Sequence, residues 1–179
     1  HIMLVVDYAA ARKFPLSVRF AALTHDLGKG VTAKALWPKH HGHEHKSVEL
    51  VEKLCQRLRT PNECRELSVL VARYHGDAHR AEELRPGTVL KLLAAIDVFR
   101  KPERFGEFVD ACTCDFHGRT GYEKREYPPA DILRCAAAAA RSVNAGAIAQ
   151  EIGDAGRIPA AIEAARLKAV TDALAAARQ

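Results

Sequence analysis

The chain has 179 residues, a length that fits one domain or one domain with an appended tail. Its 48% hydrophobic and 27% charged residues exclude a wholly disordered chain, and no apolar run approaches the roughly 20 residues that span a bilayer. The formal net charge of +5 suits a nucleic-acid or phosphate partner, although many basic proteins bind neither. The five cysteines, odd in number and without zinc-type pair spacing, favour a reduced, cytoplasmic compartment, and no signal-peptide pattern is visible.

Apolar residues recur at helical spacing in the first half of the chain, and no stretch alternates as a half-buried strand would. One helix is expected around residues 4–9. A second is expected over residues 15–27, with glycines just beyond its end. Residues 31–42 show no period and are interpreted as a loop. Next comes a helix over residues 44–59, followed by one that Pro61 opens and that runs to about His75.

The second half of the chain continues the helical pattern. Residues 76–86 are expected to be a connection, and Asp97 is expected on the helix that follows. The spacing predicts four more helices, over residues 88–99, 102–116, 130–143 and 158–177. The fold class is therefore all-α, with eight or nine helices. We divide it into a helical bundle over residues 1–152 and a C-terminal helical tail over residues 153–179.

The adjacent residues His25 and Asp26 are the first candidates for chemistry. They lie in an apolar helical segment, where a buried carboxylate needs a metal ion or a strong hydrogen-bond partner. Imidazole nitrogen and carboxylate oxygen together suit several divalent transition metals. Alone, the pair is equally well explained as polar residues at a helix end. Lys29 lies between two glycines shortly afterwards and can offer its ammonium group to a phosphate.

Histidine is unusually frequent, with nine residues in the chain and seven of them between His25 and His79. Four lie within a stretch of six residues: His40, His41, His43 and His45. That stretch is interpreted as a metal-binding tract, a phosphate-contacting loop or an ordinary polar loop. His75 and His79 are one helical turn apart. Asp97 either faces solvent or needs a partner in an apolar helix.

The order of His1, the His25-Asp26 pair and Asp97 resembles the H…HD…D pattern of the HD phosphohydrolase superfamily. In that superfamily the four side chains hold a divalent metal within a helical bundle. Further segments look like the C-terminal HD domain of the bacterial multifunctional CCA proteins, the CCA-adding tRNA nucleotidyltransferases. They are HDLGKG (25–30), LWPKHHGH (36–43), LRTPNE (58–63), KLL (91–93), IDVFRKP (96–102) and DFHGRTGYE (115–123). The resemblance covers nearly the whole chain.

The resemblance implies a metal-dependent phosphohydrolase with 2′,3′-cyclic phosphodiesterase, 2′-nucleotidase and phosphatase activities, serving tRNA 3′-end maturation and repair. Its implied metal ligands are His1, His25, Asp26 and Asp97, and the ion is Ni, Mn, Co, Mg or Zn. The implied catalytic residues are His25, Asp26 and Lys29. The candidate contacts to substrate phosphate are His40, His41, His43, His75, Arg100, Lys101 and Arg119. In two-metal relatives, the positions of His43 and His75 bind a second ion. Asp115 and Arg119, four residues apart, are interpreted first as a helical ion pair.

The implied partners are a tRNA 3′ end or nucleotide 2′-phosphates, an N-terminal nucleotidyltransferase region in the full-length protein, and a second copy of the domain. No Gly-Ser followed by Asp-x-Asp occurs, so CCA addition is not expected of this chain. His1 is treated as native because residues 3–7 resemble the family's stretch after its first histidine. Two alternatives stay open: an RNA-binding or dimerisation module with a vestigial HD site, and a hydrolase of a signalling nucleotide.

Overall fold

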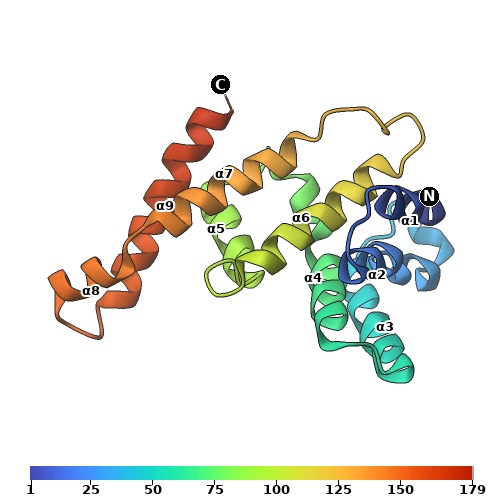
Figure 1. Cartoon of the computed structure of the whole chain (residues 1–179), viewed down its shortest axis with the longest axis horizontal. Helices are drawn as coiled ribbons and strands as arrows, with labels where there is room; N and C mark the ends of the chain where they lie inside the picture. The colour runs from blue at the N-terminus through green and yellow to red at the C-terminus, as the bar shows by residue number, and fades with distance from the viewer. Residues whose placement is uncertain (179) are drawn as a thin grey trace.

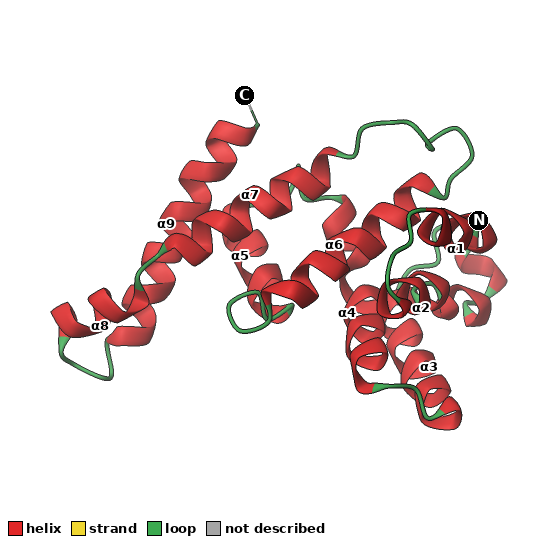
Figure 2. Cartoon of the chain, in the orientation of Figure 1, coloured by secondary structure: helices red, strands yellow, loops and turns green. Residues whose placement is uncertain are grey.

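The computed structural model describes residues 1–178, and the all-α prediction is confirmed within them (Figure 2). Two short 3₁₀ helices, η1 and η2, lie between α2 and α3. The elements are α1 (Ile2–Ala11), α2 (Leu16–Thr24), η1 (Leu27–Val31), η2 (Lys34–Leu36), α3 (His43–Leu58), α4 (Asn62–His79), α5 (Pro86–Ala95), α6 (Pro102–His117), α7 (Pro128–Ser142), α8 (Ala145–Ile152) and α9 (Ile158–Ala177). No helix of residues 1–178 has both the length and the hydrophobicity needed to cross a membrane.

The helices form two groups that α6 connects (Figure 1). Helices α1, α2, α3 and α4 gather at the end of the molecule that holds the N-terminus, and α6 packs against α1, α2 and α4. At the other end, α9 packs against α5, α7 and α8. The C-terminal part of α6 therefore lies beside the first helices of the chain, although about a hundred residues separate them in sequence.

One large hydrophobic cluster runs through both groups. It includes almost fully buried side chains from five helices: Leu67, Leu93, Phe108, Leu133 and Leu174. Full burial of a side chain of this size stabilises the fold by about 1.5–3 kcal/mol. Because α9 contributes Leu174, the C-terminal segment shares this core. The boundary between residues 152 and 153 stays a prediction.

Three predicted helix ends were wrong, and all three bear on the candidate site. Helix α2 ends at Thr24 rather than at residue 27, so His25 and Asp26 follow the helix. Helix α4 continues through Gly76 to His79, so the expected connection from residue 76 is shorter. Helix α5 ends at Ala95 rather than near residue 99. Asp97 therefore lies in a turn after the helix, with a left-handed φ of 66°. An aspartate tolerates this conformation better than most residues.

Candidate metal centre

Five elements bring histidines and aspartates to one place at the N-terminal end of the bundle. His1 precedes α1, α2 ends at the His25-Asp26 pair, α3 begins at His43, α4 carries His75 and His79, and α6 carries Asp115. The His1 side chain is 34% exposed, whereas those of His25 and Asp115 are nearly fully buried. His25 and Asp26 directly follow α2 and His43 begins α3, so the ends of these two helices bring the three side chains together.

Four imidazoles at this site share one orientation, because each uses Nδ1 to bond a main-chain carbonyl. The pairs are His1 with Gly118 at 3.2 Å, His25 with Ala22 at 2.8 Å, His43 with His40 at 3.0 Å and His75 with Val71 at 2.9 Å. A carbonyl oxygen only accepts, so Nδ1 carries a proton and Nε2 is the nitrogen that is directed at the cluster. This arrangement is typical of histidines that bind metal ions.

The Nε2 atoms of these histidines face two carboxylates. His1 Nε2 lies 2.7 Å from Asp115 Oδ1. His25 Nε2 lies 3.2 Å from Asp26 Oδ2 and 3.4 Å from Asp115 Oδ1. The other oxygen of Asp26, Oδ1, lies 3.2 Å from His43 Nε2 and 3.5 Å from His75 Nε2. Asp26 therefore lies between two pairs of imidazoles: His25 with His1 on one side, and His43 with His75 on the other. Asp115 lies beside the first pair.

These donors fit a divalent cation. His25 Nε2, Asp26 Oδ1 and His43 Nε2 are buried without a hydrogen-bond partner, which is costly unless something satisfies them. Three groups of ligand atoms each lie within 4.8 Å of one another: His1, His25 and Asp26; His25, His75 and Asp115; and Asp26, His43 and His75. Nitrogen and carboxylate oxygen suit several divalent ions, so the donor set does not select one.

The electrostatics of the cluster match its composition. Burial raises the pKa of Asp26, but the neighbouring imidazoles of His25 and His75 outweigh it and hold that pKa well below its usual range. The pKa of Asp115 is likewise held low, because the imidazoles of His25 and His79 outweigh burial. Burial lowers the pKa of His25, yet the nearby carboxylates of Asp115 and Asp26 raise it to about 10. The two carboxylates therefore attract a positive charge to this site.

The structure does not bring Asp97 to the cluster, contrary to the expectation from sequence. Asp97 bonds Arg100 Nε at 2.7 Å and Arg104 Nη2 at 3.3 Å, at the beginning of α6. Asp115 lies in the last turn of α6, and the helical rise places it about 16 Å from Arg104 along the axis. The carboxylate that completes the cluster is therefore Asp115, whose expected pairing with Arg119 is only a longer contact of 3.5 Å.

Of the residues expected to contact phosphate, some lie at the cluster and others lie away from it. Arg100 bonds Asp97, and Lys101 bonds Glu66 at 3.0 Å, so neither is at the cluster. His41 is exposed in the turn before α3, and His40 contributes its carbonyl to orient His43. Lys29 is at the cluster, with Nζ 2.5 Å from Asp26 Oδ2.

A cavity of about 430 Å³ opens beside the cluster. Its lining residues are His1, Leu4, Lys29, Gly118, Arg119 and Thr120. Lys29 and Arg119, with side chains 40% and 46% exposed, give this cavity two cations next to the buried carboxylates. An anion can therefore reach the cluster from here.

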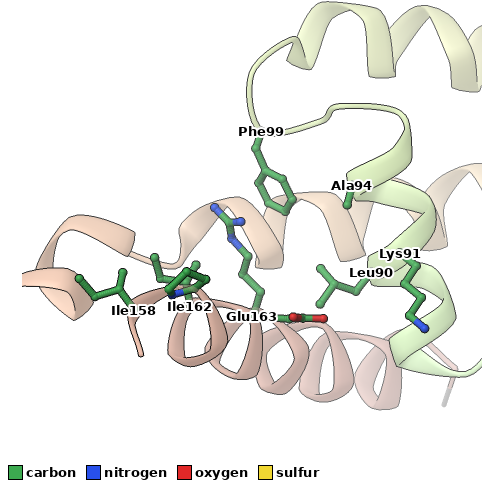
Figure 3. A pocket seen from close by; sticks show the side chains of 9 residues that line it. Leu90, Lys91, Ala94, Phe99, Ile158, Ile162 and Glu163 are labelled. Atoms are coloured by element: carbon green, nitrogen blue, oxygen red, sulfur yellow. The ribbon is translucent and has the colours of Figure 1, made fainter. Parts of the chain in front are cut away.

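A second cavity, of about 520 Å³, lies between α5 and α9 (Figure 3). The Arg166 guanidinium lies 3.6 Å from the centroid of the Phe99 ring there, and Leu90 and Ile162 supply apolar surface. No residue of the histidine-aspartate cluster lines this cavity. Its lining favours packing rather than metal chemistry.

Sequence reasoning missed Asp115, His79 and Tyr127. His79 Nε2 lies 2.6 Å from Asp115 Oδ2, and the Tyr127 hydroxyl lies 2.8 Å from His79 Nδ1. A signal for Asp115 was present, since an acid follows the apolar helical segment of residues 111–114. Nothing local distinguishes Tyr127.

A profile of the HD domain matches residues 2–101, more than half of the chain. The chain therefore belongs to the HD domain family, and it is an enzyme domain of the HD superfamily. Its first and last candidate ligands, His1 and Asp115, lie outside the matched residues.

The chain is similar to curated proteins named "Multifunctional CCA protein". It is 61% identical to that of Nitrosospira multiformis over 166 residues, which cover 90% of this chain and 40% of the relative. It is 53% identical to that of Burkholderia cenocepacia over 98% of this chain and 43% of the relative, and 51% identical to that of Dechloromonas aromatica over 97% and 42%. The chain thus spans about two fifths of these relatives. No solved structure matches it significantly.

Proposed function

We propose that this chain is a divalent-metal-dependent phosphohydrolase that acts on 2′,3′-cyclic phosphates and 2′-phosphates at an RNA 3′ end. One observation carries the proposal. The buried atoms His25 Nε2, Asp26 Oδ1 and His43 Nε2 have no hydrogen-bond partner, and their residues belong to groups of ligand atoms that lie within 4.8 Å of one another. Such a set suits a metal ion, and cations at the adjoining cavity suit a phosphate.

The residues that would hold the ion are His1, His25, Asp26 and Asp115, while His43 and His75 give Asp26 a second group of imidazoles. When bound, the metal supplies Lewis acidity and lowers the pKa of a water ligand. The family resemblance implies the same chemistry with Asp97 as the fourth ligand. The distances favour Asp115 in that role.

The cations of the cavity bind and orient the phosphate. Lys29 Nζ and the Arg119 guanidinium each touch a carboxylate of the cluster and remain partly exposed. They can therefore donate to phosphate oxygens without leaving the site, and these charge-assisted bonds are stronger than neutral ones. Both cations also stabilise the negative charge that develops on the phosphoryl oxygens during the reaction.

Asp26 is the residue best placed to orient an attacking water. Its Oδ1 is buried and free to accept a hydrogen bond, and its low pKa keeps it ionised. Burial lowers the pKa of His43, so its Nε2 stays unprotonated near neutral pH and acts as an acceptor or ligand. His43 is therefore not the group that protonates the leaving oxygen.

The relatives' name supports a wider proposal about partners. A tRNA 3′ end would be the natural substrate, and an N-terminal nucleotidyltransferase region would precede this domain in the full-length protein. A homodimer is part of the proposal on the sequence resemblance alone. The net charge of +5 is compatible with an RNA partner.

The test is hydrolysis of 2′,3′-cyclic AMP and 2′-AMP by the purified chain with Ni²⁺, Mn²⁺, Co²⁺ or Mg²⁺. We expect metal-dependent turnover that Asp26→Ala abolishes. The exposed Asp172, far along α9, gives the matched control Asp172→Ala, which keeps full turnover. Absence of metal-dependent turnover in the wild type, or equal turnover in Asp26→Ala, would refute the proposal and favour a vestigial site in an RNA-binding module.

A further inference from the structure

His79 differs from the four other imidazoles of the site, because its Nδ1 contacts a side-chain hydroxyl instead of a main-chain carbonyl. Its Nε2 faces Asp115 Oδ2 at 2.6 Å, and an ionised carboxylate can only accept, so Nε2 carries the proton. Its Nδ1 lies 2.8 Å from the Tyr127 hydroxyl, which donates to it. With Nε2 bonded to Asp115 Oδ2, His79 belongs to none of the three groups of ligand atoms that could hold an ion. It is therefore a partner of a ligand rather than a ligand.

The two oxygens of Asp115 have different partners. Oδ1 faces the cluster, 2.7 Å from His1 Nε2 and 3.4 Å from His25 Nε2. Oδ2 faces away and is held by His79, with Arg119 Nη2 at 3.5 Å. A bond to Oδ2 thus fixes the rotation of the carboxylate and keeps Oδ1 directed at the histidines.

Tyr127 is itself fixed by packing. It lies immediately before α7, is 8% exposed, and stacks on Phe116 with ring centroids 4.6 Å apart and an interplanar angle of 27°. Phe116 follows Asp115 in sequence. The ring of His79 meets that of Tyr127 edge-on at 5.6 Å. Rigid packing of this kind preorganises a hydrogen bond, because little side-chain freedom is lost when the bond forms.

We propose that His79 and Tyr127 are positioning residues that hold Asp115 in its ligand orientation, a role that rests on the proposed metal site. Tyr127 fixes the tautomer and ring orientation of His79, and His79 fixes Asp115. Hydrogen-bonded partners of metal ligands are typically worth about 10- to 100-fold in metal affinity. The metal centre then includes the end of α4 and the segment before α7, although neither His79 nor Tyr127 would touch the ion.

The experiment is calorimetric titration of the metal-free chain with Mn²⁺. We expect His79→Ala to bind Mn²⁺ about 10- to 100-fold more weakly than the wild type. Tyr127→Phe keeps the ring on Phe116 and removes only the hydroxyl, and we expect a loss of about 2- to 10-fold, the equivalent of one hydrogen bond. His79→Gln, whose amide can donate to Asp115, should recover part of the affinity.

The matched control is His45→Ala. His45 is exposed on α3 and contacts Arg73, so its removal deletes an imidazole without touching the cluster. Its Mn²⁺ affinity should equal that of the wild type. Thermal unfolding of each variant, followed by circular dichroism, separates lost affinity from lost fold. If His79→Ala proves unfolded, Tyr127→Phe decides the question.

Two results would overturn different claims. Wild-type affinity in folded His79→Ala, or in Tyr127→Phe when that variant decides, would overturn the positioning role and leave the proposed metal site intact. A wild-type chain that binds no Mn²⁺, Ni²⁺ or Co²⁺ would overturn the proposed function, and the positioning role with it.

Discussion

The orientation of the site histidines is set by the backbone. Each of His1, His25, His43 and His75 donates its Nδ1 proton to a carbonyl oxygen that helix or turn geometry holds in place. The Nε2 atoms therefore point at the cluster before any ion arrives. Preorganisation of this kind reduces the entropy lost on binding, and it favours one ligand geometry over others.

At the residue scale, Asp115 in α6 and Asp97 in the turn before α6 can be compared directly as candidate metal ligands. Asp115→Asn should lower Mn²⁺ occupancy strongly, because it replaces the carboxylate that faces His1 and His25. Asp97→Asn should leave occupancy unchanged, because Asp97 pairs with Arg100 and Arg104. Metal analysis of both purified variants after equal exposure to Mn²⁺ measures the difference. The reverse pattern would restore Asp97 as the ligand.

The choice between these aspartates shows how far sequence could go. His1, His25 and Asp26 were chosen from their pattern, and they lie together. Asp97 had the stronger local evidence, because it follows the apolar run LLAAI, whereas Thr113 interrupts the run before Asp115. Only the packing of α6 against α1 and α2 favours Asp115, because it brings the last turn of α6 to the histidines. That packing joins segments about eighty to a hundred or more positions apart and leaves no local signal.

At the element scale, η1 lies directly on the first turns of α3. Gly28 donates its backbone N–H to Ser47 Oγ at 2.8 Å, and a Cβ at Gly28 would lie 2.1 Å from the His43 carbonyl oxygen. The contact leaves no space for a side chain. The contact therefore fixes the position of Lys29, in η1, relative to that of His43, in α3.

We therefore expect Gly28→Ala to destabilise the fold by about 1–3 kcal/mol, the usual cost of overpacking, and to weaken Mn²⁺ binding. Gly30→Ala is the matched control on the same short helix, since a Cβ there meets no atom within 4 Å. It should change the free energy of unfolding by less than about 0.5 kcal/mol. Urea denaturation of both variants tests this, and equal stabilities would show that η1 can move away from α3.

Helix ends were the least predictable elements. Gly76 is of a residue type that often ends a helix, yet α4 continues through it and brings His79 to Asp115. The cost of a mid-helix glycine, about 1 kcal/mol, is small beside the tertiary contacts that α4 makes with α2, α3 and α6. The helical class and most helix positions followed from apolar spacing, which does not depend on distant residues.

At the scale of the whole molecule, α9 shares its core with the helices of the HD-domain match. Leu174 is 1% exposed within the main cluster, and Arg178 Nη2 donates to the carbonyls of Ala81 and Leu84 at 2.8 and 2.7 Å. Leu174→Ala should cost about 2–5 kcal/mol, whereas Leu167→Ala, at a 38% exposed position of the same helix, should cost far less.

Calorimetric unfolding measures both costs and the number of transitions. One transition that shifts as a whole in Leu174→Ala would indicate that α9 unfolds together with the bundle. Two separate transitions, with only the smaller affected, would support the division after residue 152.

The five thiols provide a further prediction about the whole fold. Cys55, Cys64, Cys112 and Cys114 are buried and Cys135 is exposed. Burial raises the pKa of Cys114 to about 12, so this thiol is protonated at pH 8 as well as inaccessible to reagents. A thiol reagent such as DTNB should modify one cysteine rapidly at pH 8 and four more only in denaturant. Cys135→Ser should abolish the rapid phase, and its persistence would indicate that a buried cysteine is accessible.

His1 and Asp115 are 114 positions apart in the chain, and they meet at a separation of 2.7 Å. An ion held by both would therefore close most of the polypeptide into a loop, much as a long-range cross-link does. The site cannot assemble before α6 has folded onto α1, so metal capture would be a late event in folding. An ion present at 100 times its dissociation constant would stabilise the native state by about 2.7 kcal/mol, and its removal would expose the chain to unfolding from its first helix.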